Sequence, residues 1–385
     1  MNRTEVLLAF AAKVLGGCLY GYIFSHFYEG DDTWKLHFAS IRETKMLLND
    51  PYQFFWEFGP ATAIKNGDSI AGIVGFYLND LEYCLQAKTL GIFNIISQGH
   101  YYINTVFWNF IVFWGHYWFF TLLVTEFPSK RNLYLLLIFF FPPAVLWLSG
   151  IRADGLLFVA FALCLLYFNR WLLNRRWYHL VISILGFTGV AIFRSPVAAL
   201  LIPALLGWWL STRLRVRPLL AFLSVYSFSV LIFFVSVSLS YSAPAVVVQK
   251  QREFFRLNGT AFELDTLYPT VKSFALVLPQ AVVNTFARPF PWQARGLLQG
   301  VAAADILFFW ALVVLVVLYR DPDFKTILSR PVLLSLLFWS ISLYIFIGYT
   351  IPFPGAIVRY KIIAEVCLIA VLLSFARTPV KKILI

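Results

Sequence analysis

Residues 6–24, VLLAFAAKVLGGCLYGYIF, are followed closely by the acidic segment 28–37, YEGDDTWKLH. About 20 mostly apolar residues are enough to cross a bilayer as a helix. Two adjacent carboxylates then require the chain to leave the hydrocarbon, because charge is costly there. Lys13 interrupts the apolar stretch and disfavours a cleaved signal peptide. We therefore expect a first transmembrane helix that ends just before an acidic turn.

The composition is that of a polytopic membrane protein. Of the 385 residues, 60% are hydrophobic and only 13% are charged, against about 25% charged residues in soluble domains. Sequence stretches of sufficient length predict an all-α membrane protein with about ten transmembrane helices, within limits of eight and twelve. The stretches are 6–25, 103–125, 132–149, 155–173, 178–194, 196–211, 218–240, 301–319, 331–350 and 360–376.

The distribution of Lys and Arg predicts the orientation. Basic residues are concentrated in alternate loops, and the positive-inside rule assigns such loops to the cytoplasm. We expect a plasma (inner) membrane protein with both termini in the cytoplasm. The pI of about 9.5 reflects these loops, so nucleic acid is not an expected partner, whereas membrane lipids are. The clusters are Lys130-Arg131, Arg170 with Arg175-Arg176, Arg213 to Arg217, Arg320 to Arg330, and Arg377 with Lys381-Lys382.

This orientation leaves two long segments, residues 26–102 and 241–300, outside the cytoplasm. The first contains amphipathic stretches at Trp34–Leu48 and Ala71–Leu90, which suit helices lying parallel to the membrane surface. Residues 69–81 and 273–287 are apolar but too short or too broken to cross. With no internal repeat or linker, residues 1–385 are expected to form a single transmembrane domain.

The acidic pair Asp31-Asp32 has two compatible interpretations. Either carboxylate can cap a helix that starts near Thr33. Alternatively, two neighbouring carboxylates that repel each other close to lipid indicate chemistry. No spacing of His or Cys predicts a metal site. The sequence therefore identifies no certain cofactor. A divalent metal is possible, but no residue pattern supports it.

Cations on the predicted external face form the second candidate site. They lie mainly at helix ends, against the positive-inside bias, which suggests an anionic ligand such as a lipid phosphate. The alternative is that they reach lipid headgroups or pair with acids, as Arg152 with Asp154 and Lys361 with Glu365. The candidate lipid-phosphate ligands are Arg288, Arg359, Lys361, Arg152 and Arg194.

A first helix that leads to an external Asp31-Asp32 and many further spans resembles the GT-C superfamily of integral membrane glycosyltransferases. The resemblance implies a sugar donor linked to polyprenyl phosphate or pyrophosphate, a glycan or lipid-linked acceptor, and transfer outside the cytoplasm. It also implies that Asp31 or Asp32 acts as general base or positions the acceptor. Segments 143–154 and 287–292 are loosely similar to bacterial membrane proteins of surface-polysaccharide assembly.

The residues fit such chemistry independently of the resemblance. Glycosyl transfer needs a base for the acceptor hydroxyl and positive charge near the leaving phosphate. We favour Asp32 as the base, with Tyr28, Trp34 and His37 as acceptor or sugar contacts. Two other functions are open: a polysaccharide polymerase or ligase, and a transporter or flippase of lipid-linked glycans. Transporters place ionisable residues near the bilayer midplane, where Lys13 and Asp305 are the candidates.

Overall fold

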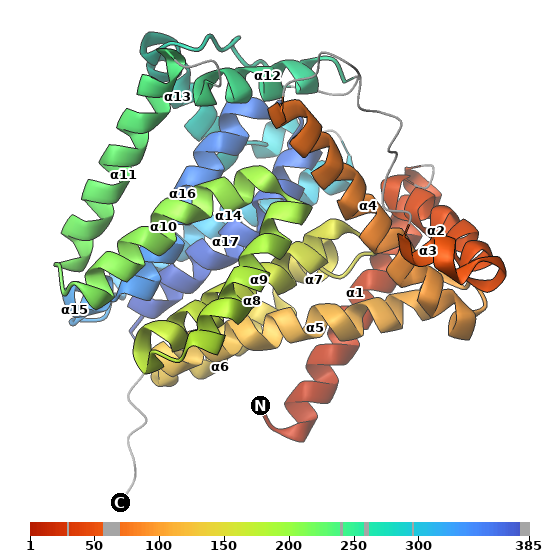
Figure 1. The fold of residues 1–385 in the computed structure, drawn as a ribbon. Coiled ribbons are helices and arrows are strands. Elements are labelled where there is room, and N and C mark those ends of the chain that lie inside the picture. Colours follow the sequence, from red (N-terminus) through yellow and green to blue (C-terminus); the bar gives the residue numbers. More distant parts are fainter. Residues whose placement is uncertain (29–30, 57–69, 239–241, 258–261, 295, 378–385) are drawn as a thin grey trace, which may run out of the picture. The chain divides into compact units, whose positions relative to one another are not determined.

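The computed structural model describes residues 1–28, 31–56, 70–238, 242–257, 262–294 and 296–377, without the side chains of residues 70–79, 297 and 298. Regular structure in these residues is helical throughout (Figure 1). The chain divides into two compact units, Met1–Ala199 and Leu200–Ile385. The single transmembrane domain expected for residues 1–385 stays a prediction.

The first unit contains nine complete α-helices in its described part. The long helices α1, α5 and α8 pack together, and α2 packs on α4. The elements are α1 (Arg3–Phe27), α2 (Asp31–Asn49), α3 (Pro51–Trp56), α4 (Ile70–Ser97), α5 (Tyr101–Glu126), the 3₁₀ turn η2 (Pro128–Lys130), α6 (Arg131–Phe140), α7 (Pro142–Trp147), α8 (Ala153–Asn174) and α9 (Trp177–Phe193).

Helix α10 (Ser195–Arg213) contains the boundary between the units. In the second unit, α16 packs against α11, α12, α13 and α17, and α17 also packs against α14. The elements are α11 (Pro218–Val235), η3 (Ser236–Ser238), α12 (Ala243–Phe255), α13 (Val271–Phe286), η4 (Pro291–Gln293), α14 (Leu297–Leu318), α15 (Phe324–Leu328), α16 (Pro331–Thr350) and α17 (Pro354–Phe375).

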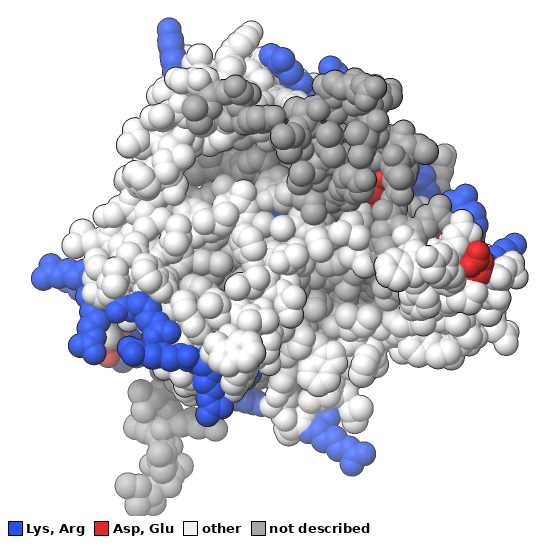
Figure 2. Space-filling view, in the orientation of Figure 1, with Lys and Arg blue, Asp and Glu red and all other residues white. Residues whose placement is uncertain are grey.

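The length and hydropathy of these helices confirm a multi-pass membrane protein. Seven of the described helices are long and apolar enough to cross a bilayer: α1, α5, α8, α10, α11 extended by η3, α14 and α16. Figure 2 shows that uncharged side chains dominate the face in view, as a lipid-facing surface requires. The expected total of about ten crossings stays a prediction.

Two expected elements differ from the structure. The stretch 132–149 is not one helix, because α6 ends at Phe140 and α7 starts at Pro142. Proline lacks an N–H and disfavours a helical conformation in the residue before it, and Phe141 is accordingly extended. Conversely, residues 69–81 are expected to form a re-entrant or interfacial piece, whereas the described part of this stretch, residues 70–81, belongs to the 28-residue helix α4.

Glycines on one face of α1 allow it to approach neighbouring segments closely. A Cβ on Gly17 would lie 2.6 Å from the carbonyl oxygen of Ser149. Likewise, a Cβ on Gly150 would lie 2.7 Å from the Tyr20 ring, which is fully buried. Side chains at these positions would therefore separate α1 from the turn before α8, where the candidate site lies.

A buried network of hydrogen-bonded polar side chains connects α2 and α4, two helices that follow α1, to α5. The Asn94 amide donates to Ser40 Oγ at 3.0 Å, and the Asn104 amide donates to Asn94 Oδ1 at 2.6 Å. Ser97 Oγ donates to Asn104 Oδ1 at 2.6 Å. These bonds join α2, α4 and α5, so the loop that contains the acidic pair is tied to a spanning helix.

Gln251 has the corresponding role in the second unit. Its side chain is fully buried, and its amide donates to the backbone oxygens of Tyr349 at 2.9 Å and Asp265 at 3.0 Å. Its Oε1 accepts from the N–H of Leu267 at 2.8 Å. One side chain therefore joins α12, the segment before α13 and the end of α16.

Candidate functional site

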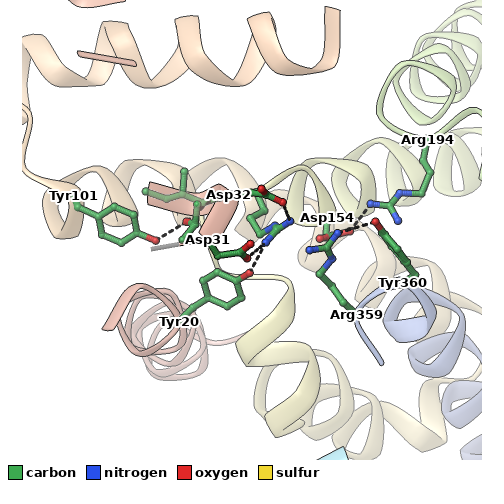
Figure 3. Close-up of polar contacts among 11 residues, drawn as sticks. Tyr20, Asp31, Asp32, Tyr101, Asp154, Arg194, Arg359 and Tyr360 are labelled. Atoms are coloured by element: carbon green, nitrogen blue, oxygen red, sulfur yellow. Dashed lines mark hydrogen bonds and ion pairs between the residues drawn. The ribbon is translucent and has the colours of Figure 1, made fainter. Parts of the chain in front are cut away.

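The acidic pair lies in the first turn of α2, and Arg152 bridges its two carboxylates (Figure 3). Arg152 Nη1 is 2.5 Å from Asp31 Oδ2, and Nη2 is 2.8 Å from Asp32 Oδ2. The Arg152 side chain is 8% exposed, whereas the Asp31 and Asp32 side chains are 30% and 63% exposed. One buried cation therefore offsets the repulsion between two more exposed anions.

The position of Arg152 follows from the approach of α1 to the turn before α8. Arg152 Nη1 also donates to the Tyr20 hydroxyl at 3.1 Å. The Tyr20 ring packs on Phe24 with ring centroids 4.4 Å apart and meets the edge of Trp147. Because Gly150 leaves room for this ring, the Tyr20 hydroxyl reaches the guanidinium group.

The start of α2 is held by its next two residues. Thr33 Oγ1 donates to the Ile151 carbonyl at 3.1 Å and lies 2.8 Å from the Tyr101 hydroxyl. Trp34 Nε1 donates to the Gly21 carbonyl at 3.0 Å. These contacts to α1, α5 and the turn before α8 direct the two Asp side chains toward Arg152.

The position of the acidic pair in the first turn of α2 also agrees with the interpretation that these carboxylates stabilise the start of a helix. Carboxylates in the first turn interact favourably with the helix dipole. Asp31 has φ +37°, an uncommon conformation that Asp tolerates better than most residues. The described helix starts at Asp31, two residues earlier than expected. Both interpretations of the pair are therefore compatible with the geometry.

Electrostatics keep Arg152 charged. Burial by itself lowers the pKa of this guanidinium group, but the interactions with Tyr20, Asp154, Asp31 and Asp32 outweigh burial and raise it. A permanently charged arginine can hold both carboxylates in place whatever the state of a bound substrate. In this structure Arg152 therefore holds the acidic pair, and its role toward an external phosphate stays a prediction.

Asp154 pairs with a residue that the sequence analysis assigned to the phosphate. Arg194 Nη2 donates to Asp154 Oδ1 at 3.0 Å (Figure 3). Asp154 lies in the first turn of α8, as expected, and Arg194 follows the last residue of α9. Arg152 and Asp154 interact electrostatically, as expected, while Arg152 donates hydrogen bonds to the acidic pair and Asp154 accepts one from Arg194.

The remaining phosphate candidates lie in the second unit and have different surroundings. Lys361 is buried and lies 3.3 Å from Glu365 Oε1, which confirms the expected pair one helical turn apart. Arg359 Nη2 donates to the Tyr360 hydroxyl at 2.9 Å. Arg288 Nη1 donates to Asn284 Oδ1 at 3.1 Å, and the guanidinium lies 5.1 Å from the centre of the Phe262 ring.

Arg288 has no acidic partner among the described residues. Its buried Nε has no hydrogen-bond partner among the described residues. Neither does any carboxylate of the described chain lie within ion-pair distance of its guanidinium group, whereas Arg152, Arg194 and Lys361 all have one. Arg288 therefore retains unused hydrogen-bonding capacity.

The three expected sugar contacts have unequal exposure. Tyr28 is 46% exposed and close to the acidic pair in sequence. Trp34 is half-buried, with one face stacked on Tyr101 at a centroid distance of 4.2 Å. His37 is buried beneath these two rings, and burial lowers its pKa below 6.5. Tyr28 is thus the ring best placed to stack on a sugar.

The bridge between Arg152 and the acidic pair was absent from the sequence analysis, because about 120 residues separate the partners. Among the described residues, no three His, Cys, Asp or Glu side chains form a candidate metal site. The sequence matches no protein-family model, and no curated protein or solved structure is significantly similar to the chain.

Proposed function

We propose that the protein is a membrane glycosyltransferase with Asp32 as its general base. It would take a sugar from a polyprenyl phosphate or pyrophosphate donor and transfer it to an acceptor hydroxyl outside the cytoplasm. The carrying observation is that Asp32 is anchored through one oxygen to Arg152 while its side chain remains 63% exposed. A base must be both fixed in direction and open to substrate.

The geometry suggests separate roles for the two carboxylates. Asp31 is less exposed and has the uncommon backbone conformation, which suits a residue that shapes the turn. Asp32 uses Oδ2 for Arg152, and its Oδ1 has no hydrogen-bond partner among the described residues. In the proposed reaction Oδ1 accepts the acceptor's hydroxyl proton.

The bond changes of the proposed reaction are those of glycosyl substitution. The acceptor oxygen forms a bond to the anomeric carbon of the sugar as its proton passes to Asp32. The bond between that carbon and the donor phosphate breaks, and the bonding electrons leave with the phosphate. Developing negative charge on the phosphate needs a cation to stabilise it.

A defined donor panel tests this proposal. Purified protein in liposomes would receive polyprenyl phosphates and pyrophosphates that carry radiolabelled glucose, galactose, mannose or N-acetylglucosamine, together with a membrane extract as acceptor source. We expect consumption of at least one donor, with release of the corresponding polyprenyl phosphate or pyrophosphate, and loss of this activity in Asp32→Asn. If the wild-type protein consumes no donor above the rate of empty liposomes, the proposal fails.

A transporter of lipid-linked glycans is the second candidate, because four ionisable side chains are buried within helices. They are Lys13 on α1, Asp305 on α14, and Lys361 and Glu365 on α17. Buried charges in membrane helices often mark transport pathways. The same donor panel distinguishes the functions: a transporter would move a donor across the bilayer intact, whereas a transferase would cleave it.

A further inference from the structure

Three ionisable side chains meet inside the second unit. Lys361 Nζ lies 3.3 Å from Glu365 Oε1 and 4.0 Å from Asp305 Oδ2. Their side chains are no more than 3% exposed. Asp305 belongs to α14, which is apolar enough to span the membrane, and Lys361 and Glu365 lie one turn apart on α17. We refer to these three residues as the buried triad.

The charges of the buried triad do not balance if every group is ionised. One ammonium and two carboxylates leave a net charge of −1 in surroundings where an uncompensated charge is very costly. Asp305 and Glu365 also repel each other as like charges when both are ionised. One proton on either carboxyl group would bring the net charge of the triad to zero.

Polar atoms of the triad that have no hydrogen-bond partner also indicate that one positive charge is needed to balance the second carboxylate. Both oxygens of Asp305 and Oε2 of Glu365 are buried without a hydrogen-bond partner among the described heavy atoms. The Tyr344 hydroxyl on α16 is also buried and unpaired within that set. Tyr344 interacts electrostatically with both carboxyl groups, and its ring centre lies 5.8 Å from Lys361 Nζ.

Other charged or titratable groups on the surrounding helices do not supply that charge. Cys367 on α17 interacts with Tyr344 but would add no positive charge. Arg359, two residues before Lys361, donates to the Tyr360 hydroxyl. Lys325 is the charged residue of α15, and it is exposed near the opposite end of α17. Among the described residues, Lys361 is therefore the cation that lies within ion-pair distance of both carboxyl groups.

We propose that the buried triad is a proton-binding site within the membrane domain. Asp305 and Glu365 hold one proton between them beside a protonated Lys361, which makes the triad neutral. Two carboxyl groups that share one proton are an established solution when like charges are forced together. Loss of the proton would leave a net negative charge between α14 and α17, so proton release should loosen the packing of these helices.

Infrared difference spectroscopy of the purified protein tests the proposal. We expect a protonated-carboxyl band that is lost in both Asp305→Asn and Glu365→Gln, because either change leaves one carboxylate paired with Lys361. Lys361→Met should strengthen the band, since both carboxyl groups then need a proton. The control Asp323→Asn, at an exposed position before α15, should leave it unchanged. The proposal would be overturned if the difference spectra of wild type minus Asp305→Asn and wild type minus Glu365→Gln contained carboxylate bands and no protonated-carboxyl band.

A second measurement needs no variant and therefore does not depend on folding of the mutants. An apolar carbodiimide reacts with protonated carboxyl groups, and mass spectrometry locates the label. We expect label on Asp305 or Glu365 of the wild-type protein, with a labelled fraction that falls as pH rises. Absence of label on both residues would contradict the proposal. So would carboxylate bands that respond to Na⁺ but not to choline, because a metal cation would then balance the charge.

Discussion

Arg152 Nη2 lies 2.8 Å from Asp32 Oδ2, and the same guanidinium group contacts Asp31. Removal of the guanidinium in Arg152→Met would leave two adjacent carboxylates without their cation. Loss of one partner from a fully buried ion pair costs about 3–5 kcal/mol. We expect a smaller cost, about 2–3 kcal/mol, because Asp32 is largely exposed and water screens it.

Thermal unfolding in detergent would measure this cost. The triple variant Arg152→Met, Asp31→Asn, Asp32→Asn removes the repulsion together with the cation, so it should recover most of the lost stability. A single variant Arg152→Met that is as stable as the wild-type protein would show that the bridge does not hold the turn together.

Gly348 should tolerate no side chain, because α16 passes directly against the backbone of α13 there. A Cβ on Gly348 would collide with the carbonyl oxygen of Ala281, which cannot rotate away. We expect Gly348→Ala to cost about 1–3 kcal/mol through overpacking. Gly300→Ala is the matched control, since a Cβ at this position of α14 has open space. Equal melting temperatures for the two variants would contradict the described packing.

Gln251→Leu should destabilise the second unit by leaving buried backbone groups unsatisfied. The side chain serves the N–H of Leu267 and the carbonyl oxygens of Tyr349 and Asp265. Each buried group left unpaired costs about 1–3 kcal/mol. Gln249→Leu, on the exposed side of the same helix, should change stability by less than about 0.5 kcal/mol. Unfolding midpoints in a denaturant series would compare the two variants.

His37 should make the stability of the first unit depend on pH. Burial lowers its pKa in the folded protein, although a hydrogen bond with the Gly99 backbone opposes this effect. The unfolded chain therefore binds the proton more readily, and the contribution of neutral His37 is complete above about pH 6.5. Stability should fall as the pH drops from there toward the folded pKa.

Melting temperatures of wild-type and His37→Gln protein across the acid range would measure this dependence. The wild-type protein should lose more stability than the variant between neutral pH and acid. If their melting curves shift in parallel, protonation of His37 does not contribute to acid destabilisation.

The sequence predicted features that depend on local order along the chain. Hydropathy gave the all-helical membrane class, and the four-residue spacing of Lys361 and Glu365 gave their ion pair. The sequence also contains a signal for the break between α6 and α7, namely Pro142-Pro143. The break was not predicted, because the apolar stretch 132–149 is long enough to cross the membrane as one helix. Hydropathy is averaged over many residues, so it does not detect the backbone restriction that one proline imposes.

Features that depend on distant partners could not be predicted in this way. The sequence assigned Arg152 to a phosphate because its position on the expected external face disagreed with the positive-inside bias. That bias counts charges but does not identify the carboxylates that meet them after folding. Asp305 and Lys361, 56 positions apart by their numbers, are a second example. The burial of Lys361 followed from the packing of α14 and α16 on α17, which no local pattern encodes.

The central claim is that Asp32 is a catalytic base while Asp31 shapes the turn. The most direct measurement is the rate of sugar transfer by Asp32→Asn and Asp31→Asn in the liposome assay, after both variants pass a folding check. Loss of a general base costs about 10²- to 10⁴-fold in rate. We expect that loss for Asp32→Asn, with Asp31→Asn affecting mainly stability. Folded variants that both retain near-normal transfer rates would contradict the claim and make the acidic pair a structural feature.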